Sequence, residues 1–352
     1  MAITKITIND VARAAGVSKG TVDRVLHNRG EVSPASREKV MGVVKELGYT
    51  PNMYASLLAS KKDIRIICLI PEYKSGEVWE LTARGIDRGG ENVFRYGARV
   101  ETVTYDQYDL DSFREACAQV LETQPSGVIL APMFRGETSK FVKELASRGI
   151  AYEYIDSKLE DDGYYAYFGM PMYQSGYLSA SLLCLSGTPA GVTVVKIARD
   201  KKGLSDPTAN RRMGFEDYFR EHCPETKISY ITIDPRDENA IHATLDDAVA
   251  RNPHILDNVV MFNSRVHLVA SWLESRGMKG LNIVGFDIIE KNLDALRGGT
   301  VRFLIGQHCD TQACAAVGAL VDCILGQGSV SKKDHYTQMD IITRHNCDWL
   351  GQ

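Results

Sequence analysis

The sequence predicts an α/β protein in which a small all-helical N-terminal part precedes two Rossmann-like lobes. Residues 7–48 show helical periodicity, with turn signals between short segments. From residue 64 onward, strand-like apolar runs alternate with helix-like segments. These runs are rich in Val and Ile, which is typical of parallel strands covered by helices on both faces of the sheet.

Two short helices joined by a tight turn are predicted over residues 7–26. Thr7 can cap the first helix with Asp10 as the capping-box acid, and Gly16 suits the left-handed turn that ends it. Ser18 can cap the second helix. The inner faces consist of Ile8, Val11, Ala12 and Ala15 in the first helix and Val22, Val25 and Leu26 in the second. Such a unit is either a helix-turn-helix, whose second helix enters the DNA major groove, or an ordinary helical hairpin.

The residues that follow favour the DNA-binding interpretation. Ser33-Pro34 begins a third helix, with cap and N1 proline in the expected order, and Gly48 ends it. A short helix is then predicted over residues 52–60. Position by position and without a gap, residues 7–60 resemble the DNA-binding headpiece and hinge helix of the LacI/GalR family of transcriptional regulators. The resemblance extends more loosely over nearly the whole chain.

The resemblance indicates which residues contact DNA. Lys19, Gly20 and Arg24 stand where family members contact bases, and Lys or Arg can bond guanine O6 and N7. Leu58 stands where a hinge leucine enters the minor groove and kinks the DNA, unless it packs on the core. Asp23 departs from the Ser common in the family; it accepts from a cytosine N4, pairs with a neighbouring cation, or is a solvated charge. The predicted DNA-binding residues are Thr7, Ser18, Lys19, Gly20, Thr21, Arg24, Asn28, Asn52, Ala55 and Leu58.

The expected elements of the body form two similar series. The first has strands at 64–71, 99–105, 127–131 and 151–156 and helices at 78–96, 111–123 and 138–148. The second has helices at 173–185, 208–221, 239–250 and 266–276 and strands at 192–197, 228–233, 259–262 and 281–286. A strand at 301–305, a helix at 311–325 and a strand near 338–343 follow.

The family resemblance implies a two-lobed, type I periplasmic-binding-protein-like core, with late segments that cross between the lobes. We therefore expect a headpiece at 1–50, a hinge helix and linker at 51–62, and an effector-binding and dimerisation domain at 63–352. The boundaries expected for lobe 1 are 63–166 plus 308–332. Those expected for lobe 2 are 167–307 plus 333–352.

Charge is distributed unevenly along the chain. Residues 1–62 contain ten Lys and Arg against five Asp and Glu, a charge of +5. Since the whole chain carries −4, the remainder carries −9. A basic head on an acidic body fits a polyanion-binding domain attached to a body that avoids DNA, although random clustering of surface charge is the alternative.

Composition excludes several other classes. The eight cysteines form no C-x-x-C pair, so we expect reduced thiols and neither a metal site nor a cofactor. No stretch is apolar enough to span a membrane, and no export signal is recognised, so we expect the bacterial cytosol, in association with the nucleoid. Catalytic motifs are lacking as well, because G-x-S-x-G at Gly16–Gly20 follows a helix rather than a strand. We therefore do not expect an enzyme.

Polar and aromatic residues at the C-terminal ends of the predicted strands suggest a ligand cleft. Asp, Asn, Arg and Gln can bond neighbouring hydroxyls, and an indole offers an apolar face to a sugar ring. The predicted effector-binding residues, which also match family cleft positions, are Tyr73, Trp79, Asp156, Arg211, Asn263, Asp287 and Gln307. Pro171 stands where the family usually shows Asp or Asn, which weakens the case for a standard hexose or pentose.

The sequence therefore predicts a ligand-responsive transcriptional regulator, a repressor of carbohydrate-utilisation genes. It would bind a palindromic double-stranded operator as a homodimer, or within a tetramer, and respond to a monosaccharide, polyol or sugar phosphate. The alternative is a cytoplasmic small-molecule binding protein without operator function.

Overall fold

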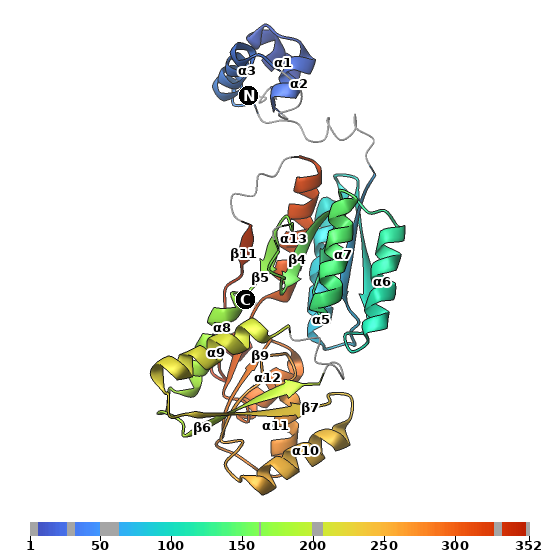
Figure 1. The fold of residues 1–352 in the computed structure, drawn as a ribbon. Coiled ribbons are helices and arrows are strands. Elements are labelled where there is room, and N and C mark those ends of the chain that lie inside the picture. Colours follow the sequence, from blue (N-terminus) through green and yellow to red (C-terminus); the bar gives the residue numbers. More distant parts are fainter. Residues whose placement is uncertain are drawn as a thin grey trace.

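The computed structural model describes residues 6–26, 32–49, 63–161, 163–198, 207–326 and 333–349 (Figure 1). Four predicted DNA-binding residues lie outside these ranges, as does the predicted helix 52–60. They are Asn28, Asn52, Ala55 and Leu58.

The described N-terminal residues, 6–26 and 32–49, form three helices: α1 (Ile8–Ala15), α2 (Lys19–Leu26) and α3 (Pro34–Leu47). The predicted capping box of α1 is present, because Thr7 N donates to Asp10 Oδ2 at 2.9 Å and Asp10 N to Thr7 Oγ1 at 3.4 Å. Gly16 ends α1 with a φ of 62°, a left-handed conformation that costs glycine little. The three helices share a small core made of Val11, Ala12, Ala15, Val22, Val25, Val40 and Tyr49.

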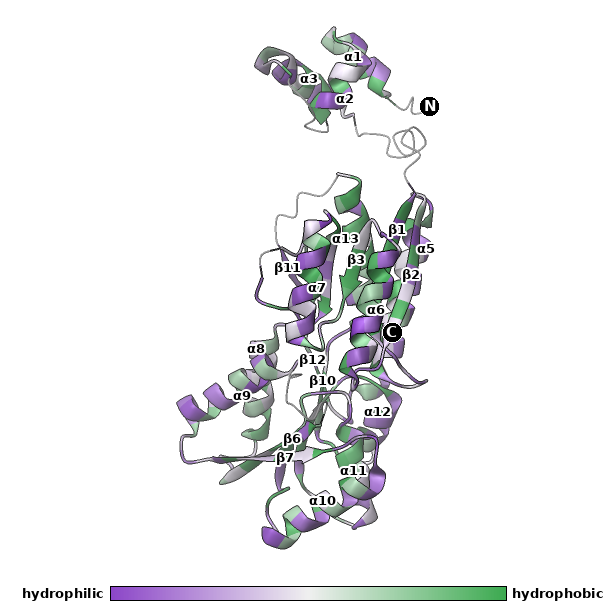
Figure 2. Cartoon of the chain, turned by 45° about the vertical axis from the view of Figure 1, so that its right-hand side comes forward, coloured by the Kyte–Doolittle hydropathy of each residue, from purple (hydrophilic) through white to green (hydrophobic). Residues whose placement is uncertain are grey.

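Lobe 1 is built on a six-stranded, fully parallel sheet in the order β11-β5-β4-β3-β1-β2. The strands are β1 (Ile64–Pro71), β2 (Ala98–Tyr105), β3 (Gly127–Leu130), β4 (Ala151–Asp156), β5 (Tyr167–Gly169) and β11 (Asp334–Tyr336). Helix α5 (Val78–Phe94) packs beside α13 (Cys309–Ile324), and α6 (Leu110–Glu122) beside α7 (Arg135–Ser147). Strands β1 and β3 and helix α13 are mainly hydrophobic, while helices such as α7 also carry hydrophilic residues (Figure 2).

Lobe 2 repeats the plan, with strand order β12-β10-β9-β8-β6-β7. Its strands are β6 (Gly191–Ile197), β7 (Lys227–Ile233), β8 (Asn258–Val260), β9 (Asn282–Phe286), β10 (Phe303–Gly306) and β12 (Asp340–Ile342), of which only β12 is antiparallel to its neighbour. Helices α8 (Met172–Leu183) and α9 (Ala209–His222) pack together. The remaining helices are α10 (Glu238–Arg251), α11 (Val266–Ser275) and α12 (Glu290–Arg297).

The chain passes between the lobes three times: from β5 to α8, from β10 to α13, and from β11 to β12. These segments are bonded to one another. Thr337 N donates to Gly169 O at 2.9 Å, and Thr337 Oγ1 donates to Gln307 O at 2.9 Å. Gln312 Nε2 donates to Gln307 O at 2.5 Å and to Thr337 Oγ1 at 2.8 Å. The three crossings are therefore joined to one another by hydrogen bonds.

The expected lobe boundaries at 166/167 and 332/333 are wrong. Strands β5 and β11 follow those boundaries in the chain, yet both pair within the lobe 1 sheet. An ion pair at 2.5 Å between Lys158 Nζ and Asp334 Oδ2 also fastens β11 to lobe 1. The crossings accordingly lie after residues 169 and 336. Both strands and α12 were missing from the predicted elements, whereas the strand expected near 338–343 is confirmed as β12.

Candidate functional site

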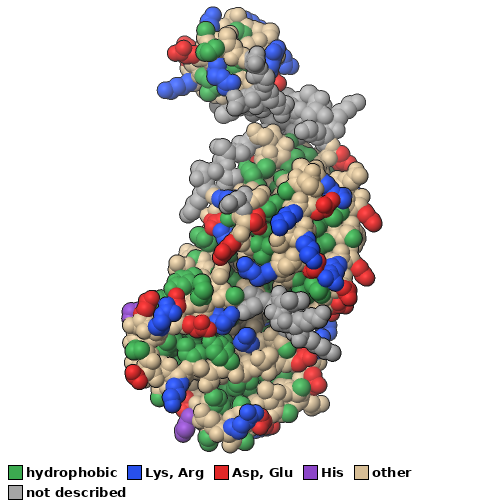
Figure 3. All heavy atoms as spheres, viewed as in Figure 1, with side chains coloured by type: hydrophobic (Ala, Val, Ile, Leu, Met, Phe, Trp, Pro, Cys, Tyr) green, Lys and Arg blue, Asp and Glu red, His purple; other side chains and the backbone are tan. Residues whose placement is uncertain are grey.

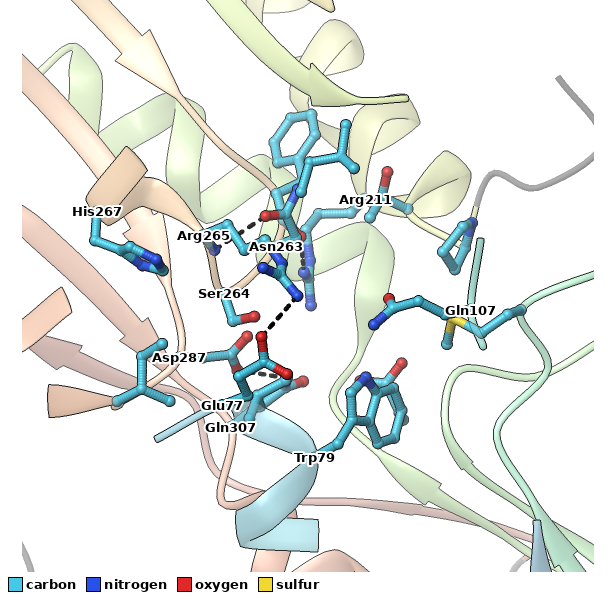
Figure 4. Close-up of a pocket in the computed structure, with 18 of the residues that line it drawn as sticks. Glu77, Trp79, Gln107, Arg211, Asn263, Ser264, Arg265, His267, Asp287 and Gln307 are labelled. Atoms are coloured by element: carbon cyan, nitrogen blue, oxygen red, sulfur yellow. Dashed lines mark hydrogen bonds and ion pairs between the residues drawn. The ribbon is translucent and has the colours of Figure 1, made fainter. Parts of the chain in front are cut away.

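A cleft lies between the lobes where the carboxyl ends of both parallel sheets face each other (Figure 4). It holds about 820 Å³ of space free of protein atoms, open solvent at its mouth included. Lobe 1 contributes the segments that follow β1, β2, β3 and β4, and lobe 2 those that follow β8, β9 and β10, with the start of α9. This is the position in which parallel α/β sheets bind ligands.

Six of the seven predicted effector-binding residues line the cleft: Trp79, Asp156, Arg211, Asn263, Asp287 and Gln307. The exception is Tyr73, which is 39% exposed and lines a neighbouring groove with Lys74 and Tyr108. Tyr73 lies only two residues after the end of β1, and the chain enters the cleft only from Gly76 onward.

Arg211 is the most enclosed cation of the cleft, with 3% of its surface exposed. Its Nε donates to Ser175 Oγ at 2.9 Å, one terminal nitrogen donates to Phe262 O, and the guanidinium lies 4.0 Å above the Phe286 ring centroid. Burial lowers the pKa of Arg211, while the negative charges of Asp287 and Asp156 oppose that shift. Arginine nevertheless stays protonated, so the cleft holds a fixed positive charge.

Helix packing explains how Arg211 enters the cleft. Helices α8 and α9 approach so closely that a Cβ on Gly176 would meet Arg211 O at 1.7 Å. A Cβ on Gly214 would likewise meet Tyr173 O at 1.9 Å. Any larger residue would therefore push the helices apart and shift the first turn of α9, from which Arg211 projects.

Asp287 is the buried carboxyl of the cleft, with 4% of its surface exposed. It ends the β9 segment in a left-handed conformation, φ 73°, and Gln307 Nε2 donates to its Oδ1 at 2.5 Å. Burial raises the pKa of Asp287 to about 7; Asp156 adds to the rise, while Arg211 and the Gln307 hydrogen bond oppose it. Gln307 Oε1 is buried and has no partner among the described residues.

The remaining predicted residues complete a surface suited to a polar, cyclic ligand. Asp156 ends β4, also in the left-handed region with φ 65°. Asn263 Oδ1 accepts from Arg265 N at 3.0 Å, which orients the amide. Trp79 is 7% exposed in the first turn of α5, and its indole stands opposite the polar groups of lobe 2 (Figure 4).

One ion pair joins the lobes across the cleft. Arg265, which precedes α11 in lobe 2, donates to Glu77 Oε1 of lobe 1 at 3.1 Å. At the neighbouring edge, the guanidinium of Arg236 from lobe 2 lies 5.3 Å from the Tyr108 ring of lobe 1. These contacts hold the two lobes against each other at the mouth of the cleft.

Five of the six described members of the predicted DNA-binding set, Ser18, Lys19, Gly20, Thr21 and Arg24, lie on α2 or directly before it; the sixth, Thr7, precedes α1. Lys19, Gly20 and Arg24 are exposed, while Val22 and Val25 of the same helix are buried. Ser18 Oγ accepts from Thr21 N at 3.1 Å and thus caps the helix, as predicted. The side chain of Thr7 is hydrogen-bonded within the N-cap of α1. Lys and Arg side chains also gather on the visible face of this part of the molecule (Figure 3).

Two family models match this chain. Residues 7–52 match the bacterial regulatory proteins of the lacI family, and residues 67–328 match the periplasmic binding protein domain. The chain belongs to the periplasmic binding protein domain family, with a lacI-family headpiece in front. The predicted recognition and fold class are thereby confirmed.

Individual relatives agree with that assignment. The HTH-type transcriptional regulator DegA of Bacillus subtilis is 33% identical over 147 residues, 42% of each chain. The sucrose operon repressor of Pediococcus pentosaceus is 29% identical over 215 residues, 61% of each chain. A crystal structure assigned to the LacI transcriptional regulators, from Bacteroides fragilis, is 29% identical with a TM-score of 0.77, and the match covers 82% of this chain and 99% of that one. The chain thus spans less than two thirds of the length of these curated relatives.

Sequence reasoning missed several residues that line the cleft: Glu77, Gln107, Ser264, Arg265, His267 and Lys291. Asn292, which is fully buried, was also missed; its Nδ2 donates to the carbonyls of Ser264, Phe286 and Asp287. His267 N in turn donates to Asn292 Oδ1 at 3.2 Å. Burial lowers the pKa of His267. A polar residue inside an otherwise apolar helix face was the available signal for Asn292.

Two absences hold for the described ranges. No helix there has both the length and the apolarity to cross a bilayer. Within the same ranges, no cluster of three or more His, Cys, Asp and Glu side chains could hold a metal ion. All eight cysteines are free.

Proposed function

We propose that this chain is a ligand-responsive, sequence-specific DNA-binding transcriptional regulator that acts as a repressor of carbohydrate-utilisation genes in the cytosol. The observation that carries the proposal is the joining, in one chain, of a headpiece with exposed Lys19 and Arg24 to a cleft with buried, paired polar groups. A solute-binding protein without operator function has no use for the headpiece.

The ligand we propose is a monosaccharide, polyol or sugar phosphate. Arg211 offers donors; Asp156 and Asp287 offer acceptors; Asn263 and Gln307 can do both. Paired donors and acceptors of this kind match vicinal hydroxyls, and the face of Trp79 suits the C–H groups of a sugar ring. The sucrose operon repressor among the relatives supports a sugar-related effector.

The proposed coupling is a change in lobe orientation. A ligand that bridges Asp287 and Arg211 of lobe 2 with Asp156 of lobe 1 binds the closed arrangement better than the open one, so it shifts the population of lobe arrangements. In a homodimer, or a tetramer, the shift would change the spacing of the paired headpieces and hinge helices. Coupling of about 1–3 kcal/mol would change affinity for a palindromic operator about 5- to 150-fold.

The decisive experiment pairs a ligand screen with a DNA titration. Full-length protein is screened by thermal shift against sugars, polyols and sugar phosphates, because a ligand at about 100 times its Kd stabilises the fold by about 2.7 kcal/mol. Selected operator DNA and random DNA are then titrated with and without the hit, by fluorescence anisotropy. The expected result is specific binding that the hit changes in wild type but not in Asp287→Ala.

Two outcomes contradict the proposal. Ligand binding with no preference for any DNA sequence would indicate the alternative, a small-molecule binding protein. If wild type and Arg24→Ala bind all DNA sequences with the same salt-dependent affinity, α2 does not recognise bases. Lys45→Ala, which removes an exposed cation from α3, is the matched control for Arg24→Ala.

A further inference from the structure

A second pocket lies beside the effector cleft and shares two wall residues with it, Met172 and Pro207. It holds about 670 Å³ of space free of protein atoms, solvent at the mouth included. Its walls come from the start of α7, the residues after β4, and the start of α8. None of the residues to which we assign effector binding or DNA binding lines it, and so it is a separate site.

The charge of this pocket differs from that of the effector cleft. Its described lining includes two cations, Arg135 and Lys158, and no Asp or Glu, whereas the effector cleft includes Glu77, Asp156 and Asp287. Lys158 is neutralised by Asp334, but no ion pair or hydrogen bond of the Arg135 side chain occurs within the described residues. In a chain with a net charge of −4, a pocket whose charged lining residues are both cations, one of them without an ion-pair partner among the described residues, is suited to an anion.

Helix α8 points its N-terminus at the same pocket. Met172, Tyr173 and Gln174, the first three residues of this 12-residue helix, all line it. The preceding residue is Pro171, which has no side-chain acceptor to cap the helix, and the first backbone hydrogen bond runs from Ser175 N to Pro171 O. Three N–H groups and the positive end of the helix dipole are therefore available to an anion.

A buried hydroxyl in the wall provides an independent indication of a ligand. Ser157 lines the pocket and is 6% exposed. Its Oγ is buried and has no hydrogen-bond partner among the described residues. A buried hydroxyl without a partner is destabilising, so the wall of this pocket contains an unsatisfied donor.

We propose that this pocket is an anion site that takes a phosphate group, held by Arg135, the α8 amides and Ser157. A phosphate offers several acceptor oxygens, enough to bond a guanidinium, helix N–H groups and a hydroxyl together. Pro171, the departure from the family pattern, then has a physical consequence. An Asp or Asn at this position could cap α8 with its own side chain, whereas Pro171 leaves the helix end open to an external anion.

The test is a titration of the full-length protein with inorganic phosphate at constant ionic strength, with chloride as the reference salt. Melting temperature and calorimetric heat should both saturate. Arg135→Ala should weaken phosphate binding about tenfold, the effect of losing one charge-assisted hydrogen bond. Lys143→Ala, which removes an exposed cation from the same helix away from the pocket, should bind phosphate like wild type.

A second pair of variants tests the helix end. Pro171→Asp should raise the melting temperature without phosphate and weaken phosphate binding, because its carboxylate occupies the amides. Pro171→Ala, which adds no carboxylate, should keep phosphate binding. If Arg135→Ala and Pro171→Asp both bind phosphate like wild type, the pocket is not an anion site.

Two further arms locate the phosphate and identify its source. If Asp287→Ala loses phosphate binding while Arg135→Ala keeps it, the ion binds in the effector cleft and the proposal is wrong, whatever the fate of the regulator proposal. Titration with a hexose phosphate and its parent hexose separates the sources. If Arg135→Ala weakens binding of the phosphorylated sugar only, the phosphate group belongs to the ligand. If Arg135→Ala weakens binding of inorganic phosphate only, the pocket takes a free phosphate ion. No effect on either contradicts the proposal.

Discussion

The headpiece and the cleft hold their polar side chains in opposite ways. In the headpiece, hydrogen bonds of functional residues join neighbours: Thr7 with Asp10, Ser18 with Thr21, and Arg24 with Gly20. All of these bonds are exposed, and their partners are three or four residues apart. In the cleft, Arg211 donates to a carbonyl 51 residues away and Gln307 to a carboxylate 20 residues away, and both bonds are buried.

This difference separates function from stability in one region and joins them in the other. An exposed side chain that does not cap a helix, such as Arg24, can be removed with little effect on folding, because water replaces its contacts. A buried side chain with distant partners leaves unsatisfied groups behind when it is removed. Mutations of exposed headpiece side chains outside the caps, such as Arg24, should therefore change binding alone, whereas mutations in the cleft should change both. Thr7 and Ser18 cap α1 and α2, so their loss should also lower stability.

The largest expected effect is that of Arg211→Ala. Loss of the guanidinium leaves Ser175 Oγ and Phe262 O without their donor and opens a cavity beside Phe286. We expect a loss of about 3 kcal/mol or more in the free energy of unfolding, together with loss of ligand binding. Urea denaturation of Arg211→Ala and Arg24→Ala measures the contrast. A stability within about 0.5 kcal/mol of wild type for both variants would contradict it.

Next in size is the effect of Arg24→Ala on operator binding. Loss of a bidentate base contact should cost about 1–3 kcal/mol and relax preference at one base pair, with stability unchanged. Anisotropy titrations against operators altered at single positions measure this effect. Uniform weakening on all sequences would instead assign Arg24 to a phosphate contact.

A smaller effect is expected from pH. The pKa of Asp287 is raised to about 7, and the ionised form accepts more ligand hydroxyls than the protonated form does. Affinity should therefore rise by about tenfold between pH 6 and pH 8. Without ligand, the stability of the fold depends on pH in the opposite direction. The contribution of Asp287 to the free energy of unfolding is complete below the pKa of its unfolded state and is lost as pH rises through 7. The control is calorimetry on Asp287→Asn. If ligand affinity of this variant depends on pH as in wild type, Asp287 is not the titrating group.

The smallest expected effect comes from Glu77→Gln at the mouth of the cleft. The ion pair with Arg265 is partly exposed, so its loss should cost about 0.2–1 kcal/mol. If the ion pair favours the closed arrangement of the lobes, Glu77→Gln should bind the ligand more weakly. Operator binding without ligand should then change in proportion to the population of the closed arrangement. Arg265→Ala should behave alike, and the double variant should show less than the sum of the two effects. Strict additivity would mean that the pair contributes nothing.

Much of the fold could be predicted because its signals are local. Apolar periodicity placed α1, α2, α3 and the long strands, and the three crossings came from the family resemblance. Strands β5 and β11 were missed because each has three residues and exists through pairing with a partner distant in the chain. The lobe boundaries were wrong for the same reason. Tyr73 was misplaced because a strand end predicts an edge of the sheet, not the path of the following loop.

The sequence by itself determined the helix-turn-helix, the basic charge of the headpiece, and six residues that line the cleft. Capping, periodicity and strand ends act over a few residues, so they can be read directly from the chain. The tertiary structure alone decided the ion pair of Glu77 with Arg265, the support of three carbonyls by Asn292, and the raised pKa of Asp287. Each of these depends on burial and on groups brought together from distant segments, because electrostatic interactions act through space rather than along the chain.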